Sequence, residues 1–435
     1  MSGVGAALAG LTTRGRCLLA AGAALVACAF LLGQRDLLRV GVFLVALPLV
    51  AVAVVARTRY RLACTRRLEP SRVEAGRTST VRLHLDNVSR LPSGVLLMED
   101  ALPYTLGGRP RFVLDRVEPN GARDVSYPAR SEVRGRFVVG PLSVRMTDPF
   151  GLCELTRAFA SRDELVVTPV VTALPPVRLG GDWAGGGDSS ARAVASSGAD
   201  DVATREYRHG DDLRRVHWRS TARTGELMVR REEQPFQNRA TLVLDGRRSA
   251  HHGDGPASSF EWSVSAVASI GVALSRAGFG LSLLRETGAS LAPAGLPLTE
   301  GLLLESLATV ALSRTDDLDA LAERLRRTGG GVLVAVLGDL DPAQAERLAR
   351  GRSSPGGVVV LVDTESWSSR SASARSAAAD RHAASAAVLT GAGWRVLPVQ
   401  HGTTLPSVWP LAARRGGGRP AVGFRPSIVP AGARP

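Results

Sequence analysis

The sequence predicts an N-terminal two-helix transmembrane hairpin, an all-β sandwich and an α/β domain with a doubly wound, mainly parallel sheet. Three observations lead to this order. Two uncharged apolar runs stand near the start, short alternating apolar runs follow as far as residue 172, and continuous apolar strands separated by amphipathic segments fill residues 236–412. A chain of 435 residues is long enough for several parts that each bury a core.

The first part is the hairpin, which we place at residues 17–56. Residues 17–33 and 40–56 are apolar, uncharged and separated by a short polar break. Each run lies near the lower length limit of a membrane-spanning helix, and two runs in succession argue against a cleaved signal peptide. The two runs therefore predict a two-pass protein of the plasma membrane. Five arginines follow within residues 57–67, and an excess of positive charge marks the cytoplasmic side. Residues 1–16 and the bulk of the chain should then be cytoplasmic.

Residues 64–172 carry the pattern of the sandwich. In the segment STVRLHLDN (79–87), Val81, Leu83 and Leu85 alternate with polar residues, as expected of a strand with one solvated face. Further short runs follow at spacings typical of antiparallel sandwiches. His84 lies on the polar face of this strand, so we expect it to be solvated rather than to bind a metal.

Two segments lack periodicity. Residues 173–204 are rich in Gly, Ser, Ala and Asp, and we expect a flexible linker there. Residues 413–435 contain Gly and Pro throughout and are expected to form a disordered tail.

The second soluble domain, residues 236–412, contains strands that are apolar on both faces. Such strands with helices between them predict a parallel sheet covered on both sides. We expect strands at residues 240–245, 279–286, 331–339, 357–363 and 394–399, and helical segments at 259–278, 302–312 and 317–327. Asp245, Asp339 and Asp363 fall at carboxyl ends of strands, where the sites of such folds lie and carboxylates can converge.

The composition excludes some classes of function. The formal net charge is +14 and every basic side chain apart from histidine is arginine, which is typical of a genome rich in G and C, so the charge is weak support for a nucleic-acid partner. A basic surface is still attracted to anionic membranes and acidic proteins. The four cysteines show neither the paired spacing of a zinc site nor the density of a disulfide framework.

A charged segment, REYRHGDDLRRVHWRSTARTGELMVRREEQP, occupies residues 205–235 and holds eight arginines against six acids. Phosphate binding favours arginines without neighbouring acids, so this balance argues against nucleic acid. We expect a turn and short helix, then a strand, with interlocked arginine–carboxylate pairs. Exposed Arg and Trp anchor protein interfaces, so the segment is also a candidate docking surface. The candidate docking residues are Arg205, Tyr207, Asp211, Asp212, Arg214, His217, Trp218 and Arg230.

An alternative hypothesis gives this segment a catalytic role. His217 would act as a general base oriented by Asp211 or Asp212 in a metal-dependent hydrolase or transferase. However, no partnered nucleophile is evident, and Ser220 and Thr221 are more typical of helix-end hydroxyls. We therefore predict a protein that is not an enzyme and has no catalytic residues.

Two long motifs resemble a known family. RGRFVVGPLSVRMTDPFGL at residues 134–152 and the charged segment are similar to the bacterial domain of unknown function 58 family. The resemblance implies a von Willebrand factor type A-like domain after the second motif. It also implies association with MoxR-type AAA+ ATPases, and often with membrane-bound transglutaminase-like proteins. We therefore expect a membrane-anchored cytoplasmic scaffold that works with such an ATPase in assembling or remodelling a membrane or envelope complex.

Type A domains hold Mg²⁺ with a D-x-S-x-S motif at the end of the first strand, and this chain has DGRRS at that place. Asp245 and Ser249 match the motif, but Arg247 stands where the first serine is expected. A guanidinium is a poor neighbour for a divalent cation and can itself neutralise Asp245. We therefore expect no cofactor, with Asp245, Ser249 and Asp339 as the candidate ligands if Mg²⁺ binds. An adhesion-type protein-binding module with a degenerate metal site is the remaining alternative.

Overall fold

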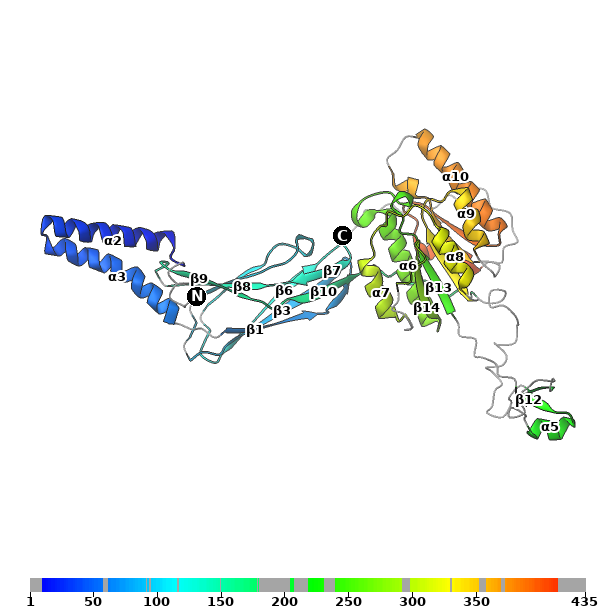
Figure 1. Cartoon of the computed structure of the whole chain (residues 1–435), viewed down its shortest axis with the longest axis horizontal. Helices are drawn as coiled ribbons and strands as arrows, with labels where there is room; N and C mark the ends of the chain where they lie inside the picture. The colour runs from blue at the N-terminus through cyan, green and yellow to red at the C-terminus, as the bar shows by residue number, and fades with distance from the viewer. Residues whose placement is uncertain are drawn as a thin grey trace, which may run out of the picture. The chain divides into compact units, whose positions relative to one another are not determined.

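The computed structural model describes residues 10–57, 62–90, 92–93, 95–115, 117–148, 150–177, 179, 204–206, 218–230, 239–291, 298–328, 331–351, 357–368 and 372–413. The chain divides into two compact units, Met1–Val170 and Val171–Pro435. Figure 1 shows both units.

The first unit begins with two helices, α2 (Thr13–Leu32) and α3 (Arg35–Arg57), which lie side by side (Figure 1). Gly33 ends α2 in the left-handed conformation, with a φ of 67°, and its N–H donates to the carbonyl of Ala29. A Cβ on Gly22 would lie 2.8 Å from Val45 Cγ2, so the helices approach closely there. Both helices are long and apolar enough to cross a membrane, as the two runs predicted.

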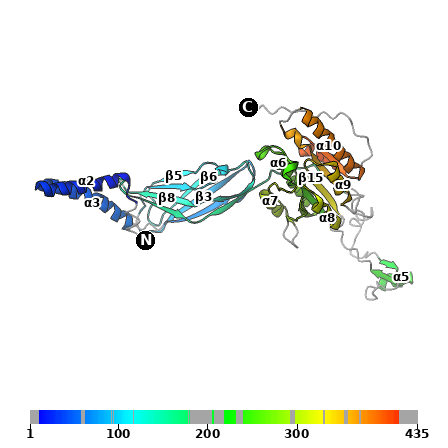
Figure 2. The same ribbon diagram turned by 45° about the horizontal axis from the view of Figure 1, so that its top comes forward.

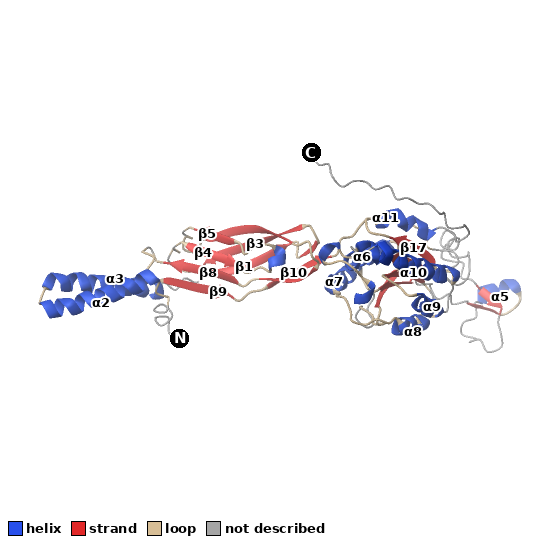
Figure 3. Ribbon diagram, turned by 90° about the horizontal axis from the view of Figure 1, so that it is seen from above, coloured by secondary structure: helices blue, strands red, loops and turns tan. Residues whose placement is uncertain are grey.

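The rest of the first unit consists of short strands in three sheets, drawn in red in Figure 3. The sheets have the orders β1-β3-β6, β2-β10-β7 and β5-β4-β8-β9. All their pairings are antiparallel except that of β2 with β10. The strands are β1 (Leu62–Glu69), β2 (Arg72–Glu74), β3 (Thr78–Asn87), β4 (Leu96–Asp100), β5 (Arg111–Leu114), β6 (Ala122–Arg130), β7 (Gly135–Val139), β8 (Leu142–Thr147), β9 (Glu154–Phe159) and β10 (Asp163–Thr168), with a 3-10 turn, η1 (Tyr104–Leu106).

Strand β3 follows the predicted alternation. Val81, Leu83 and Leu85 are fully buried in the core of this unit. The side chain of His84 is half exposed, and its Nδ1 lies 2.7 Å from a carboxylate oxygen of Asp124. His84 therefore takes part in a surface contact rather than in the core.

The second unit contains a five-stranded sheet of order β14-β13-β15-β16-β17, in which every pairing is parallel. Because β13 and β15 are neighbours while the chain passes through β14 between them, the strand order reverses at this pair, which is the switch point of a doubly wound sheet. The strands are β13 (Arg239–Leu244), β14 (Gly280–Arg285), β15 (Val332–Leu337), β16 (Val358–Val362) and β17 (Arg395–Val399). All five lie at the predicted positions.

Helices cover both faces of this sheet (Figure 2). One core cluster joins α6 (Ser259–Arg276) and α7 (Glu300–Thr309) to residues such as Leu242 and Val334. The other joins α8 (Asp319–Arg327), α9 (Pro342–Arg350) and α10 (Ala372–Gly391) to residues such as Val243 and Leu333. Since neighbouring strand residues point to opposite faces, the two clusters lie on opposite sides.

The second unit also includes chain that precedes residue 204. Val171, Leu174 and Val177 pack against the core on the α6 face, and Leu179 is buried in it. The N–H of Thr172 donates to Ser269 Oγ at 2.9 Å. Leu174, Val177 and Leu179 are thus packed although they fall in residues 173–204, which the sequence assigned to a flexible linker, and Val171 and Thr172 fall in the range expected for the sandwich.

Candidate functional site

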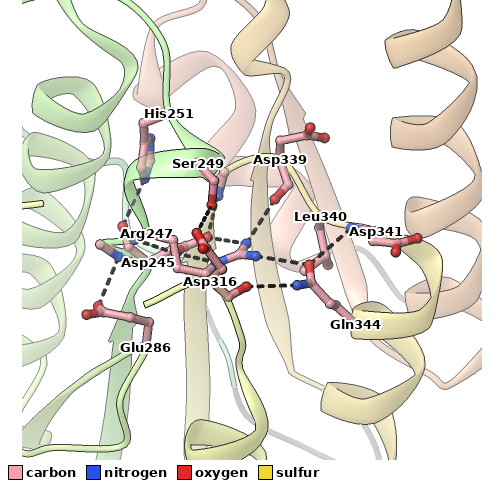
Figure 4. A network of polar contacts seen from close by, with 12 residues as sticks. Asp245, Arg247, Ser249, His251, Glu286, Asp316, Asp339, Leu340, Asp341 and Gln344 are labelled. Carbon is pink, nitrogen blue, oxygen red and sulfur yellow. Dashed lines mark hydrogen bonds and ion pairs between the residues drawn. The ribbon is translucent and has the colours of Figure 1, made fainter. Parts of the chain in front are cut away.

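The switch point of the parallel sheet is occupied by a network of buried polar groups centred on Asp245 (Figure 4). Asp245 follows β13 directly and its side chain is fully buried. Its N–H donates to the carbonyl of Val336 in β15, at 3.0 Å. Its Oδ2 accepts from the N–H of Gly338, just after β15, at 3.2 Å. The carboxylate is thus held between the ends of the two strands.

Arg247 fills the space in front of this carboxylate. Its Nε lies 3.0 Å from Asp245 Oδ1 and its Nη2 lies 2.8 Å from Oδ2, so the contact is bidentate. The backbone N–H of Arg247 donates to the same Oδ1 at 3.1 Å. The guanidinium also donates to Gln344 Oε1 and to the carbonyl of Asp339, both at 2.9 Å. Only 2% of Arg247 is exposed, so the pair is shielded from solvent.

The pair fixes the ionisation of the acid. Burial alone would raise the pKa of Asp245, because desolvation disfavours the charged carboxylate. The hydrogen bonds and the charge of Arg247 outweigh burial and hold this pKa below its ordinary value. The side chain of Asp245 is therefore ionised, and the guanidinium of Arg247 neutralises its charge.

His251 makes a further hydrogen bond to the loop that carries Asp245. Its Nε2 lies 2.9 Å from the carbonyl oxygen of Asp245 and its Nδ1 lies 3.1 Å from Ser259 Oγ. A carbonyl only accepts, so Nε2 carries the proton and Nδ1 of the neutral ring accepts from the serine hydroxyl. Burial lowers the pKa of His251, which keeps the ring neutral.

Glu286 adds a second buried carboxylate to the network. It follows β14, is fully buried, and accepts from the N–H of Gly246 through Oε2 at 3.1 Å. Arg285 Nη2 pairs with its Oε1 at 3.1 Å. A Cβ on Gly246 would lie 2.7 Å from Glu286 Oε2, so a larger residue here would displace this carboxylate. Glu286 ends a predicted strand, and that position was the sequence signal that could have identified it.

The candidate metal ligands are not brought together. Ser249 is exposed, and its Oγ donates to Asp316 Oδ1 at 2.7 Å. The carboxylate of Asp339 lies 3.8 Å from Arg381, while only its backbone carbonyl contacts Arg247. Asp363 Oδ2 accepts from Gln400 at 3.4 Å. Asp245 is thus closed off by Arg247, whereas Asp339 and Asp363 both lie near His382, whose pKa burial lowers and these two carboxylates raise. Within the described ranges, no group of three His, Cys, Asp or Glu side chains is arranged to hold a metal ion.

The charged segment is described only in part. Strands β11 (Thr204–Glu206) and β12 (Met228–Arg230) pair antiparallel, and α5 (Trp218–Thr224) lies between them. The predicted strand thus pairs within the segment, and Thr221 Oγ1, inside α5, accepts from the N–H of Met228 at 3.0 Å. Trp218 is 71% exposed. The remaining candidate docking residues lie outside the described part or have only their backbone described: Arg205, Tyr207, Asp211, Asp212, Arg214, His217 and Arg230.

A second buried ion pair, in the first unit, was not predicted. Arg66 Nη2 lies 2.7 Å from Asp100 Oδ1, and its Nη1 lies 3.0 Å from Asp163 Oδ2. Tyr127 donates its hydroxyl to Asp100 Oδ2 at 2.5 Å. These residues link β1, β4, β6 and β10, so the cluster joins strands from all three sheets.

Comparison with known proteins gives one family. The family model described as protein of unknown function DUF58 matches residues 203–366, which supports the resemblance carried by the charged segment. None of the curated proteins compared with the chain matches it.

Two solved structures match about a quarter of this chain, both with low TM-scores. A CARDB domain from Pyrococcus furiosus is 9% identical with a TM-score of 0.19, covering 25% of this chain and 93% of that one. A chain of the human seminal-plasma complex of zinc 2-glycoprotein with prolactin inducible protein is 11% identical with a TM-score of 0.20, covering 26% and 98%. TM-scores this low carry no argument about fold or function.

Proposed function

We propose that this protein, whose residues 203–366 match the DUF58 family model, is a membrane-anchored cytoplasmic adaptor that binds other proteins and carries out no catalysis of its own. The anchor is the hairpin of α2 and α3, followed by a β-sandwich and a von Willebrand factor type A-like domain. Its main partner is a MoxR-type AAA+ ATPase, with which it assembles or remodels a membrane or envelope complex. A transglutaminase-like membrane protein is a second partner that the family resemblance implies.

The observation that carries this proposal is the contact of Arg247 with Asp245. A divalent cation needs carboxylate oxygens that face an open coordination position. Here both oxygens of Asp245 already accept hydrogen bonds from Arg247, and the second also accepts from Gly338. The strand-end position used by metal-dependent sites is therefore a closed internal ion pair, which supports metal-independent binding.

The proposed binding surface lies in the charged segment. Trp218 is 71% exposed on α5, where the surrounding sequence is rich in arginine. Tryptophan and arginine are the residue types most often found to dominate binding energy at protein interfaces. An exposed tryptophan on a short helix supports docking of a protein partner at this segment.

The test is affinity purification of the tagged full-length protein from membranes in mild detergent, with and without ATP, followed by mass spectrometry. We expect a MoxR-type ATPase to be recovered. Trp218→Ala should lower its recovery, because loss of a central tryptophan costs about 2 kcal/mol or more, or ~30-fold in affinity. Tyr104→Ala, which removes a 92% exposed aromatic from the first unit, is the matched control and should leave recovery unchanged. Absence of the ATPase from the wild-type sample would contradict the proposal.

A further inference from the structure

The turn between β8 and β9 holds part of the motif MTDPFGL, to which the proposed function gives no role. Asp148, which is 7% exposed, organises this turn with its carboxylate. Its Oδ2 accepts from the N–H of Phe150 at 3.0 Å, and its Oδ1 accepts from the N–H groups of Leu152 and Cys153 at 2.7 and 2.6 Å. One buried side chain thus fixes the shape of the turn.

This turn is bonded to the start of the first apolar helix. The N–H of Thr12 donates to the carbonyl of Leu152 at 3.0 Å, and Thr12 Oγ1 donates to the carbonyl of Gly151 at 2.7 Å. The N–H of Glu154 donates to the carbonyl of Gly10 at 2.8 Å. A Cβ on Gly15 would collide with the carbonyl oxygen of Leu152, so the helix approaches the turn as closely as glycine allows.

Both helices of the hairpin take part in this contact, and their ends lie beside the β8–β9 turn in two views (Figures 1 and 3). Leu11, Ala51, Val52, Leu152 and Cys153 form one buried apolar cluster. Val52 precedes the last residue of α3, Arg57, by five positions, which is about 7.5 Å along a helix. If the hairpin crosses a bilayer, the turn therefore lies at the depth of the membrane–water interface.

Phe150 stands at the tip of this turn with 66% of its surface exposed. Arg14 and Arg16, on the first turn of α2, are exposed as well. Phenylalanine is among the apolar side chains that membrane-surface segments bury at the boundary between headgroups and acyl chains, and arginines are attracted to anionic headgroups. Phe150 is thus an exposed apolar ring on a turn that is hydrogen-bonded to the start of α2, where a lipid surface would cover it if the hairpin crosses a bilayer.

We propose that Phe150 is a second membrane contact, inserting its ring into the headgroup–acyl boundary of the bilayer that α2 and α3 cross. The inference rests on the membrane anchoring in the proposed function. Together with the Thr12 and Gly15 contacts, Phe150 holds the β-strand part of the first unit against the membrane surface. This part of the unit then does not move freely relative to the bilayer.

The test uses the full-length protein in vesicles of phosphatidylcholine and phosphatidylglycerol, with a photo-crosslinking phenylalanine analogue placed at one position at a time. Phe150 is the test position, and Phe43, 63% exposed on α3, reports the membrane span itself. Tyr104 is the matched exposed aromatic control. Strand β4 pairs with β8 so that Leu96 faces Met146 beside the turn and Asp100 faces Leu142, which places Tyr104 beyond the opposite end of the sheet.

We expect lipid adducts at positions 43 and 150 and none at position 104. Adducts at 43 with none at 150, or crosslinks from 150 to protein alone, would overturn the inference and leave the proposed anchoring intact. Equal lipid labelling at 150 and 104 would also overturn it, because contact would not be specific to the turn. No lipid adduct at 43 would overturn the proposed anchoring and the inference together.

Discussion

The guanidinium of Arg247 lies in two-point contact with the carboxylate of Asp245, with Nε 3.0 Å from Oδ1 and Nη2 2.8 Å from Oδ2, and both side chains are buried. An internal cation thus stands at the strand end where a metal-dependent site would need an open position. The pair closes the switch point and ties the loop after β13 to the loop after β15.

Arg247→Met should destabilise the protein strongly. The change removes the cation and leaves the Asp245 carboxylate buried without a charge partner, which costs about 3–5 kcal/mol. Thermal denaturation of the full-length protein in detergent measures the effect. The control is Arg82→Met, since the Arg82–Glu69 pair is exposed and contributes at most about 1 kcal/mol. Equal melting temperatures for the two variants would show that the buried pair contributes no more to stability than the exposed pair.

Added Mg²⁺ should leave the melting temperature of the wild-type protein nearly unchanged at millimolar concentration. The reason is that Arg247 already occupies both carboxylate oxygens of Asp245. A saturable rise of several degrees that disappears in Asp245→Ala would show that a cation displaces the guanidinium, contrary to this account.

Stability should fall as the solution is acidified through the range in which histidine titrates, and His251 should contribute to that fall. Burial lowers the pKa of His251 in the folded protein, whereas in the unfolded chain this histidine titrates at about pH 6.5. The unfolded state therefore binds a proton first, so His251 supports folding above that pH and loses this contribution as the pH falls toward its folded pKa. His251→Gln cannot be protonated there and should show a smaller loss of melting temperature between about pH 7.5 and 5.5. An identical pH dependence in the variant would refute the assignment.

Tyr127→Phe should weaken the first unit. The hydroxyl donates to Asp100, which is fully buried and paired with Arg66, and a hydrogen bond to a charged group contributes about 1.5–3 kcal/mol. Tyr104→Phe removes a hydroxyl from a 92% exposed ring and should have no effect on the same melting curve. If both variants melt alike, the buried hydroxyl does not hold the cluster together.

The periodic features of the fold could be predicted from the sequence. The two apolar runs, the alternation in β3 and the five apolar strands of the parallel sheet depend on local patterns of hydrophobicity, which report burial directly. The pairing of Arg247 with Asp245 was also foreseeable, because the two residues are only two positions apart.

The long-range polar contacts could not be predicted in the same way. Gln344 meets Arg247 across 97 positions, and Asp163 meets Arg66 across the same separation. A local sequence pattern does not reveal which residue a charged side chain will pair with. That partner depends on which strands and helices become neighbours in the folded chain. Similarly, MTDPFGL was recognisable as a motif, but its contact with Thr12 depends on the distant helix packing against the turn.

The central claim is that the protein works by binding and not by catalysis, and His217→Gln tests this claim most directly in a strain that lacks the gene. Glutamine keeps polarity and approximate size but cannot act as a general base. We predict that the gene for this variant corrects the defect of the deletion strain as fully as the wild-type gene does. The variant should also capture the ATPase as the wild type does. A variant that is stably produced and captures its partner normally, yet restores no function, would contradict the adaptor account and favour a catalytic His217.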